Sequence, residues 1–596
     1  MFLTSLFAAV MAAQQAASTP TFDRDIAPII FQNCSSCHQP GQSGPFPLLT
    51  YADAKKHAAE IASVTKSRYM PPWLPEPGYG HFQDERRLTG EQIKTIAAWV
   101  AAGAPEGEKK DLPPAPPAVH GWQLGKPDLV VTAAAPFRVP ASGSDVFWNF
   151  VFTPDLSATR YVRAIEILPG GLGPNGEASA RIVHHANVLV DRTGSAERME
   201  AKPGAGFPGM ELNLDRNPFD PESHFLFWKT GGAPYSEAEG FSWRLDPGNQ
   251  LILNTHLQPS GKSETIQPSI GLYFTDRPPT HFPLLMELED DNALNIPAGA
   301  RNFTVFDSFR LPMDLDVLAI YPHAHSLGKL LEASATLPNG SRTWLIRIPD
   351  WNFDWQAVYR YREPVFLPKG AVISMRFTYD NSRANPRNPN DPPKRVEAGN
   401  HASDEMAHLW LQVLPRGRGD RRRELQEALL RHRLDKVPAD FQAHLSLGAL
   451  MMSRLETQDA IGQFQTAIKL NPGSAEAHDM LGSGLRSVGR SSDALAQYRL
   501  ALRADSAYMD ACYNLATTLA RAGQLDEALA DFRQVIDAFP NSSRLRNEFG
   551  ELLARKGDLS AALSQFDKAV SLDSSNQYAV KNREWAAQKL ASVAGK

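Results

Sequence analysis

The feature that most constrains this chain is a 34-residue period that runs from Pro438 to the C-terminus. Large apolar residues recur at two positions of the period, and alanine recurs at a third. The aligned sets are Leu447, Leu481, Leu515 and Phe549; Phe464, Tyr498, Phe532 and Phe566; and Ala460, Ala494, Ala528 and Ala562. Small residues let two helices cross closely, and large residues fill the space between them. The period therefore predicts helix pairs stacked into an α-solenoid.

This period resembles that of the tetratricopeptide repeat family. The resemblance implies four repeats over residues 438–574 and a capping helix near Asn576–Leu590, within residues 575–596. Cys512 lies inside one repeat and is expected to be a small core residue. Because such solenoids present a concave face to other chains, the repeats are expected to bind a protein or peptide partner.

The chain has 596 residues, too many for one hydrophobic core, and this length predicts about three to five domains. The formal net charge of -5 argues against nucleic acid as a partner. The three cysteines are too few for a disulfide framework, since two of them share one short motif. No internal run approaches the roughly 20 apolar residues of a membrane span, so no transmembrane segment is expected.

Residues 1–17 combine an apolar stretch with small residues and resemble a secretory signal peptide. No Lys or Arg precedes the apolar stretch, and Arg24 is the first basic residue. A buried or frayed N-terminal helix is therefore the alternative. A signal peptide predicts an extracytoplasmic protein, either periplasmic or secreted.

The segment Cys34-Ser35-Ser36-Cys37-His38 has the spacing of a c-type haem attachment site. Two thiols at this spacing can add to the haem vinyl groups, and the adjacent His38 can reach the iron. A redox or zinc site is the alternative, although the absence of a second CxxC motif counts against zinc. We therefore expect haem c as a cofactor.

The sixth iron ligand should be a thioether or an imidazole further along the chain. Met70, which a proline follows, resembles the axial methionine of small cytochromes c. His57 and His81 are the alternative ligands, and core packing is the alternative role of Met70. Residues 20–108 as a whole resemble a small α-helical cytochrome c domain with one haem.

Two further segments follow from local signals. Thr89–Gly103 is predicted to be the closing helix of this first unit, because Thr89 and Gln92 can form a capping box. Residues 109–120 are rich in proline and should form a semi-extended linker.

Between residues 121 and 415, short alternating apolar runs are separated by Pro, Gly, Asn and Asp, a pattern typical of antiparallel strands. The expected strands lie within residues 128–133, 145–152, 182–190, 250–255, 269–274, 317–321 and 372–379. The region is long for one sandwich, and a proline-rich seam lies at Thr275–Pro283. We therefore expect two tandem antiparallel β-sandwiches, over residues 121–277 and 278–415. Arginine-rich residues 416–437 should form a charged linker helix, either solvated or in contact with an anionic surface.

Five histidines and one methionine form an ordered set in the β region: His184, His185, His256, His323, His325 and Met406. His323 and His325 follow a buried strand, and side chains two residues apart on a strand share a face, so the pair can grip a metal. Five imidazoles and a thioether suit copper. Adjacent His184 and His185 point to opposite faces of a regular strand. They can bind one metal only if the strand twists, bulges or ends there.

The order of these motifs resembles the copper type II, ascorbate-dependent monooxygenases, the family of peptidylglycine and dopamine hydroxylases. The motifs are Val183-His184-His185-Ala186, Asn254-Thr255-His256-Leu257, Pro322-His323-Ala324-His325 and Ser403-Asp404-Glu405-Met406. The resemblance implies jelly-roll-like sandwiches and two copper ions. One ion would be held in the first sandwich by His184, His185 and His256. The other, catalytic ion would be held in the second sandwich by His323, His325 and Met406, a set that favours the O2-binding Cu(I) state.

The implied activity is hydroxylation of a C–H bond in a small-molecule substrate with O2. Its electrons would come from an ascorbate-like donor or from the cytochrome c unit of the same chain. Tyr321 stands where peptidylglycine hydroxylases have an arginine near the His-x-His pair, so a peptide C-terminus is not favoured as substrate. The alternative function is a haem and copper electron-transfer and docking scaffold without oxygenase activity.

Several neighbouring residues have alternative roles. Met375 could replace Met406 as the thioether, although the alternation around it favours a core position. His401 and His408 flank Met406 and are expected either beside the metal ligands or in solvent. An aromatic cavity or ordinary core packing would account for Trp351, Trp355 and Tyr359.

Overall fold

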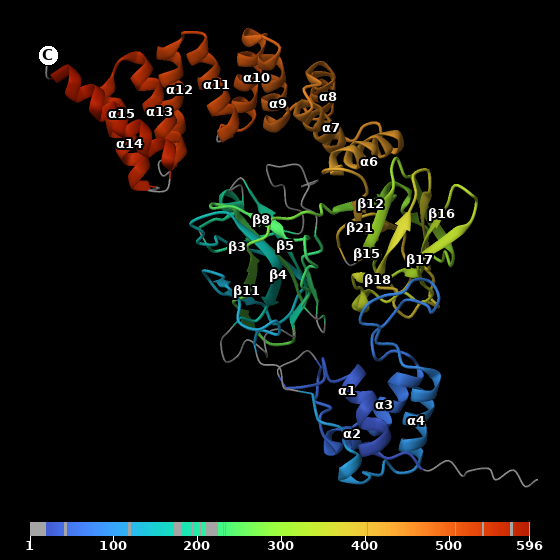
Figure 1. The fold of residues 1–596 in the computed structure, drawn as a ribbon. Helices are drawn as coiled ribbons and strands as arrows, with labels where there is room; N and C mark the ends of the chain where they lie inside the picture. The colour runs from blue at the N-terminus through green and yellow to red at the C-terminus, as the bar shows by residue number, and fades with distance from the viewer. Residues whose placement is uncertain are drawn as a thin grey trace, which may run out of the picture.

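The protein is described by a computed structural model, which covers residues 19–40, 44–116, 121–171, 182–192, 196–202, 204–209, 224–229, 232, 234–401, 403–506, 508–538, 542–572 and 576–594. Figure 1 shows a small helical unit, two β-sheet bodies and an arch of paired helices. This arrangement confirms the expected multidomain chain with antiparallel strands in its middle and a helical solenoid at its C-terminus. The expected signal peptide, residues 1–17, lies outside the described residues. Within the described part of the chain, no helix has the length and hydropathy needed to cross a membrane.

The N-terminal helical unit has a small core of its own, which includes the fully buried Phe22 and Trp99. Its helices are η1 (Phe22–Ile26), α1 (Ala27–Asn33), α2 (Tyr51–Lys56), α3 (Ala58–Lys66) and α4 (Gly90–Ala101). The predicted capping box opens α4, because the Thr89 hydroxyl accepts the Gln92 N–H and the Gln92 side chain accepts the Thr89 N–H. The expected linker begins with a 3-10 turn, η2 (Lys109–Asp111), and residues 112–116 are irregular.

The first β-sheet body encloses one core between two sheets. Its strands are β1 (Leu129–Thr132), β2 (Phe137–Val139), β3 (Val146–Phe152), β4 (Arg160–Leu168), β5 (Val183–Asp191), β6 (Phe207–Pro208), β7 (Phe227–Lys229), β8 (Trp243–Leu245), β9 (Gln250–Leu257), β10 (Glu264–Ile266) and β11 (Ser269–Thr275), with a 3-10 turn η4 (Ala196–Met199). The sheets have the orders β1-β11-β4-β8 and β6-β3-β9-β5-β7, and β10 pairs with β2. Val162 and Leu272 from one sheet share a core with Phe150 and Leu253 from the other.

The second β-sheet body repeats this layout. Its strands are β12 (Leu284–Glu289), β13 (Asn295–Ile296), β14 (Phe303–Arg310), β15 (Leu315–His323), β16 (Gly328–Thr336), β17 (Arg342–Ile348), β18 (Tyr359–Leu367), β19 (Val372–Tyr379), β20 (Val396–Glu397) and β21 (His408–Pro415), with 3-10 turns η5 (Asp291–Ala293) and η6 (Phe353–Trp355). The sheets have the orders β12-β21-β15-β18 and β14-β19-β16-β17, and β13 pairs with β20. Ile373 and Phe377 from one sheet share a core with Leu411 and Val413 from the other.

An arm of the N-terminal unit joins the second body. Phe82 is buried in the core of that body, and Trp73 packs against the same core. Phe82 also forms an antiparallel bridge to Tyr361, and the Gln83 N–H donates to the Arg360 carbonyl at 2.8 Å. Residues 73–83, which were expected within the haem unit, therefore lie on the second β-sheet body, because their aromatic rings find an apolar core there.

The arginine-rich segment expected at 416–437 forms α6 (Arg422–Lys436). Leu425 and Leu429 of this helix lie in the core of the second β-sheet body, whereas Leu430 lies in the core of the repeats. The helix is therefore buried along one side rather than solvated all round.

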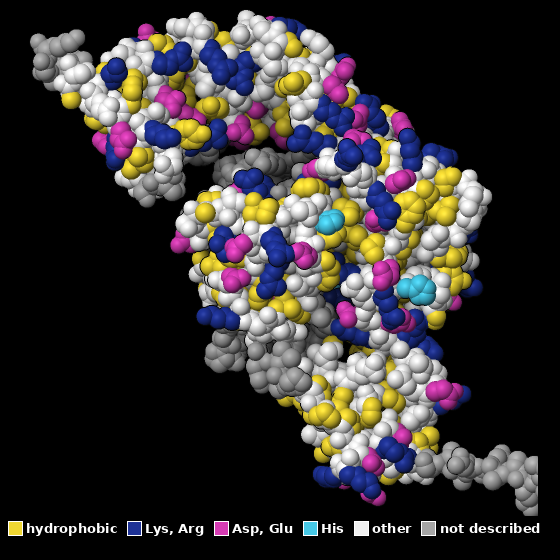
Figure 2. All heavy atoms as spheres, viewed as in Figure 1, with side chains coloured by type: hydrophobic (Ala, Val, Ile, Leu, Met, Phe, Trp, Pro, Cys, Tyr) yellow, Lys and Arg dark blue, Asp and Glu magenta, His cyan; other side chains and the backbone are white. Residues whose placement is uncertain are grey.

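The C-terminal arch consists of α7 (Phe441–Ser453), α8 (Thr457–Leu470), α9 (Ala475–Ser487), α10 (Ser491–Ala504), α11 (Met509–Arg521), α12 (Leu525–Ala538), α13 (Ser543–Lys556), α14 (Leu559–Leu572) and α15 (Gln577–Ala594). Glycines at the 34-residue spacing let the helices of a pair cross closely. A Cβ at Gly482 would lie 2.5 Å from the Tyr498 ring, and Gly448 faces Phe464 in the same way. Figure 2 shows basic and acidic side chains intermingled over this arch, so neither sign of charge dominates that view.

We predict that Gly482→Leu destabilises the solenoid by about 1–3 kcal/mol, because the new side chain must displace the Tyr498 ring. Gly462 in α8 has open space around its Cα and provides the matched control. Gly462→Ala should stabilise the helix by about 0.5–1 kcal/mol. Hydrogen exchange in the full chain measures both effects, on the α9 and α10 amides for Gly482→Leu and on the α8 amides for Gly462→Ala. Wild-type protection of α9 and α10 in Gly482→Leu would contradict the prediction.

Candidate metal centres and the adjoining cavity

A β-bulge brings the adjacent histidines of β5 to one point. The register between β5 and β9 shifts between Val183, which pairs with Leu257, and His185, which pairs with His256. His184 is the extra residue of this bulge. Because the bulge turns its side chain out of the normal alternation, His184 and His185 can both approach His256. Two adjacent histidines of one strand need such an irregularity to bind one metal, and β5 has it.

The ring nitrogens of the three histidines form a compact cluster. The distances are 3.3 Å from His184 Nδ1 to His256 Nδ1 and 3.3 Å from His256 Nδ1 to His185 Nε2, and all three ligand atoms lie within 4.8 Å of one another. Two nitrogens bound to one ion at about 2.0 Å with tetrahedral geometry lie about 3.3 Å apart. The cluster therefore fits a transition metal that accepts imidazole ligands, a group that includes zinc and copper.

One acceptor sets the orientation of the His256 ring. Its Nε2–H donates to the Asp145 carboxylate at 2.6 Å, which leaves Nδ1 as a lone pair that faces the other two rings. Burial lowers the pKa of all three histidines, and that of His184 falls to about 4. The rings are therefore neutral at pH 7, the form that binds metals.

His323 and His325 form a second pair, with ring centroids 5.3 Å apart at the end of β15. His323 donates its Nδ1–H to the Gln356 carbonyl oxygen at 2.7 Å, and His325 donates its Nδ1–H to the Asp404 backbone carbonyl at 3.0 Å. Each ring thus keeps Nε2 as a lone pair, as metal-binding histidines do. Burial lowers the pKa of both rings, that of His323 to about 3.

The Asp404-Glu405-Met406 segment is fastened to the turn that carries His325. The buried Glu405 carboxylate accepts the backbone N–H groups of His325 at 2.7 Å and Leu327 at 2.6 Å. Met406 follows directly and is 7% exposed, and its carbonyl accepts the Tyr379 hydroxyl. The acidic residue before the methionine therefore holds the methionine segment against the histidine turn.

The neighbouring residues have other partners. His408 lies between the carboxylates of Glu287 and Asp291, which raise its pKa to about 10, so its ring is a cation and not a ligand. His401 is exposed and hydrogen-bonded to Asp404. Met375 is fully buried in the core of the second β-sheet body, the position that its alternation favoured.

The two histidine clusters meet at Phe353 in η6. The Phe353 ring centroid is 5.5 Å from that of His184, 5.3 Å from that of His325 and 6.3 Å from that of His323. One aromatic ring therefore touches a histidine of each β-sheet body. The loop between β17 and β18 places this ring, and no motif pointed to it.

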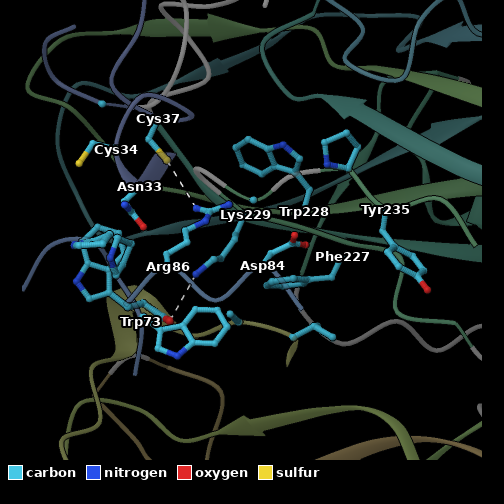
Figure 3. A pocket seen from close by; sticks show the side chains of 18 of the residues that line it. Asn33, Cys34, Cys37, Trp73, Asp84, Arg86, Phe227, Trp228, Lys229 and Tyr235 are labelled. Carbon is cyan, nitrogen blue, oxygen red and sulfur yellow. Dashed lines mark hydrogen bonds between the residues drawn. The ribbon is translucent and has the colours of Figure 1, made fainter. Parts of the chain in front are cut away.

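A cavity of about 550 Å³ opens where the N-terminal unit meets both β-sheet bodies. Its wall includes all four residues expected to hold haem, Cys34, Cys37, His38 and Met70. Neither alternative axial histidine is among the described residues that line it. The wall also includes Phe227, Trp228 and Lys229 of β7 (Figure 3) and the segment that begins at Trp355. This volume is within the range of ordinary ligand pockets.

The surroundings of His38 suit an iron ligand. His38 donates its Nδ1–H to the Phe46 carbonyl at 3.0 Å, which leaves Nε2 for a metal, and burial lowers the ring pKa. His57 instead stacks on Phe46, with centroids 3.6 Å apart. A Cβ at Gly44 would lie 2.9 Å from the His38 ring, so the glycine leaves the space that the ring occupies.

Sequence comparison identifies the class of the C-terminal domain. Residues 452–509 and 513–577 match the tetratricopeptide repeat family, so this part of the chain is a tetratricopeptide repeat solenoid.

Solved structures similar to it include YrrB, a TPR protein with an unusual peptide-binding site (22% identity, 27% of this chain and 84% of that chain, TM-score 0.25). MamA from Desulfovibrio magneticus (21%, 26% and 89%, TM-score 0.25) and a thermophilic TPR protein from Thermus thermophilus (21%, 28% and 91%, TM-score 0.24) are also similar. No curated protein matches the chain.

We predict that Asp145→Asn weakens metal binding at the three-histidine cluster by about 10–100-fold, because the neutral amide holds the His256 ring less firmly. Competition against a chelator measures the affinity, starting from metal-free protein. The exposed Asp155→Asn serves as the control. An unchanged affinity in Asp145→Asn would contradict the assigned role of Asp145.

Acid should destabilise the metal-free protein in a defined window. Unfolded histidine titrates near about 6.5, whereas the folded pKa is about 4 for His184 and about 3 for His323. The unfolded chain therefore binds more protons than the folded chain in this pH range. The free energy of unfolding falls as the pH drops below about 6.5. Thermal unfolding between pH 6.5 and 4.5 should show this slope. His323→Asn should reduce it, and an identical slope in that variant would contradict the explanation.

Proposed function

We propose that the protein is a copper-dependent monooxygenase that hydroxylates a C–H bond of a small molecule with O2. The observation that carries the proposal is the meeting of two clusters of neutral imidazoles at Phe353, one from each β-sheet body. Structural zinc sites are closed four-ligand cages, whereas imidazole and thioether ligands together suit copper. The order of the ligand motifs, which resembles the type II copper monooxygenases, supports the same conclusion.

Each cluster would hold one metal ion with a different role. His184, His185 and His256 would hold one copper ion, and His323, His325 and Met406 would hold the second. Copper, when bound, would supply one-electron redox chemistry at the first site and O2 activation at the second. Asp145 and Gln356 hold ring orientation, so that nitrogen lone pairs face each site without rearrangement.

Aromatic side chains pack against the histidines of the second cluster. The Phe353 ring covers His325, and Tyr321, whose hydroxyl donates to Gln356 at 2.6 Å, lies beside His323. Phe227 of the first β-sheet body packs against Tyr321, with centroids 5.6 Å apart. An apolar enclosure of this kind favours a small substrate with an unactivated C–H bond over a charged peptide terminus.

The cavity supports haem c as an electron source, besides an ascorbate-like donor. Two of its wall residues are close neighbours of the histidine clusters. Lys229 pairs with His185 across the β5–β7 ladder, and Trp355 ends the turn that begins with Phe353. Cys34, Cys37, His38 and Met70 would hold the haem, which would supply single electrons. Haem attachment and the apolar N-terminal stretch both support an extracytoplasmic location.

A second candidate function is a haem and copper electron-transfer and docking scaffold without oxygenase activity. The tetratricopeptide repeats favour this candidate, because such repeats bind a protein or peptide partner. Both functions predict bound metal and haem, and only the first predicts O2 consumption coupled to a hydroxylated product.

Metal loading and O2 uptake distinguish the candidates. We expect two copper ions per chain and O2 uptake with a reductant and a panel of small C–H donors. His323→Ala should lower the rate by about a hundredfold or more, because a bound metal lowers a barrier by several kcal/mol. The exposed His281→Ala is the control. Two bound copper ions without any product across the panel would favour the scaffold, and no bound copper would end both proposals for the clusters.

A further inference from the structure

The first helix of each repeat lies on the inner side of the arch that Figure 1 shows. Neighbouring first helices bond one another: Asn514 of α11 donates to Asp479 of α9 at 2.9 Å, and Asn582 of α15 donates to Asn547 of α13 at 2.9 Å. No two of the described second helices, α8, α10, α12 and α14, approach one another as closely as α9 and α11 do. Since a solenoid curves toward the side on which its helices are closest, the first helices form its concave face.

Three carboxylates gather on this face where α9 meets α11. Glu476 and Asp479 are three residues apart and share one side of α9, and Asp510 stands 34 residues after Glu476, at the same position of the next repeat. Asp479 is 7% exposed, and its hydrogen-bond partner is the neutral amide of Asn514. Burial and the neighbouring carboxylates raise the pKa of Glu476 and of Asp479 to about 7. Within the described ranges, no lysine or arginine forms an ion pair with any of the three.

Two arginines lie near these carboxylates without neutralising them. Arg544 pairs with Glu548 at 3.1 Å and lies over the Tyr513 ring. Arg486 acts on Asp479 through its charge but forms no ion pair with it. Carboxylates held together in a partly buried place are costly unless a cation joins them, so a cationic ligand would stabilise the group.

The other end of the same face is aromatic. Tyr578 of α15 stands 34 residues after Arg544 and therefore shares the repeat position of Glu476 and Asp510. Trp585 follows Tyr578 by seven residues, which is two helical turns, so both rings lie on one side of α15. Tyr578 is 78% exposed and Trp585 is 45% exposed. Exposed aromatic residues that share a face are typical of protein–protein interfaces.

We propose that the concave face of the solenoid binds an extended, basic segment of a partner protein. A lysine or arginine of the segment pairs with Glu476, Asp479 and Asp510, and an apolar side chain packs on Tyr578 and Trp585. Packed helices lie about 10 Å apart, so α11 and α15 are separated by about 20 Å, which an extended chain spans in roughly six residues. The basic and apolar residues of the partner are therefore about six residues apart. This inference goes beyond the proposed copper and haem chemistry and does not depend on it.

A library of random peptides displayed on phage, selected on the full chain, tests the chemistry of the partner. The enriched peptides should carry Lys or Arg about six residues from an aromatic or aliphatic residue. Enrichment of Asp or Glu, the absence of any charge preference, or the absence of any enriched peptide would overturn the proposal.

Fluorescence anisotropy of one enriched, dye-labelled peptide then locates its site on the full chain. Asp510→Asn should raise the Kd about tenfold, and the difference should shrink at high salt, which screens the lost charge pair. Tyr578→Ala should also raise the Kd about tenfold, because it removes an aromatic contact. The exposed Asp567→Asn on the second helix α14 removes the same charge away from the concave face and should leave the Kd unchanged. A wild-type Kd in Asp510→Asn or in Tyr578→Ala would overturn the proposal.

Discussion

A buried imidazole that gives one N–H to a fixed acceptor has only one nitrogen left to offer, and that nitrogen points in a fixed direction. Four of the candidate ligand rings are held in this way. Their acceptors are Phe46 O for His38, Asp145 for His256, Gln356 for His323 and Asp404 O for His325. Each acceptor fixes both the tautomer and the angle of its ring. The candidate chemistry depends on these bonds, because a ring free to rotate would present N–H groups and lone pairs at random.

The turn η6 contacts both β-sheet bodies and the N-terminal unit. Phe353 touches histidines of both β-sheet bodies, and Trp355 reaches the Tyr69 ring of the N-terminal unit, with centroids 5.7 Å apart. Gln356, the next residue, accepts hydrogen bonds from His323 and Tyr321. Three residues within a stretch of four therefore contact three domains. A change in the packing of these domains would therefore alter the contacts of this turn.

Local patterns predicted local structure well. The 34-residue period, the alternating strands and the Thr89 capping box depend on neighbours within a few residues or one repeat, so the sequence contains them directly. The histidine motifs also named the residues of the first cluster, and the conflict between His184 and His185 required the bulge that β5 contains.

Long-range partners could not be predicted. Asp145 lies 111 residues from His256, and Gln356 lies 33 residues from His323. Neither belongs to a motif. The arm at residues 73–83 has a composition that fits a helical unit as well as a sheet surface, so nothing local revealed that Phe82 enters another core. The many arginines of α6 likewise indicated a solvated helix, although three of its leucines lie in two different cores.

Those three leucines have a mechanical consequence. Leu425 and Leu429 are anchored in one hydrophobic interior and Leu430 in the next, so α6 cannot swivel without opening one of them. The solenoid is thus joined to the second β-sheet body through a packed helix and not through a flexible linker. A partner bound by the solenoid would therefore have a fixed orientation relative to the second β-sheet body.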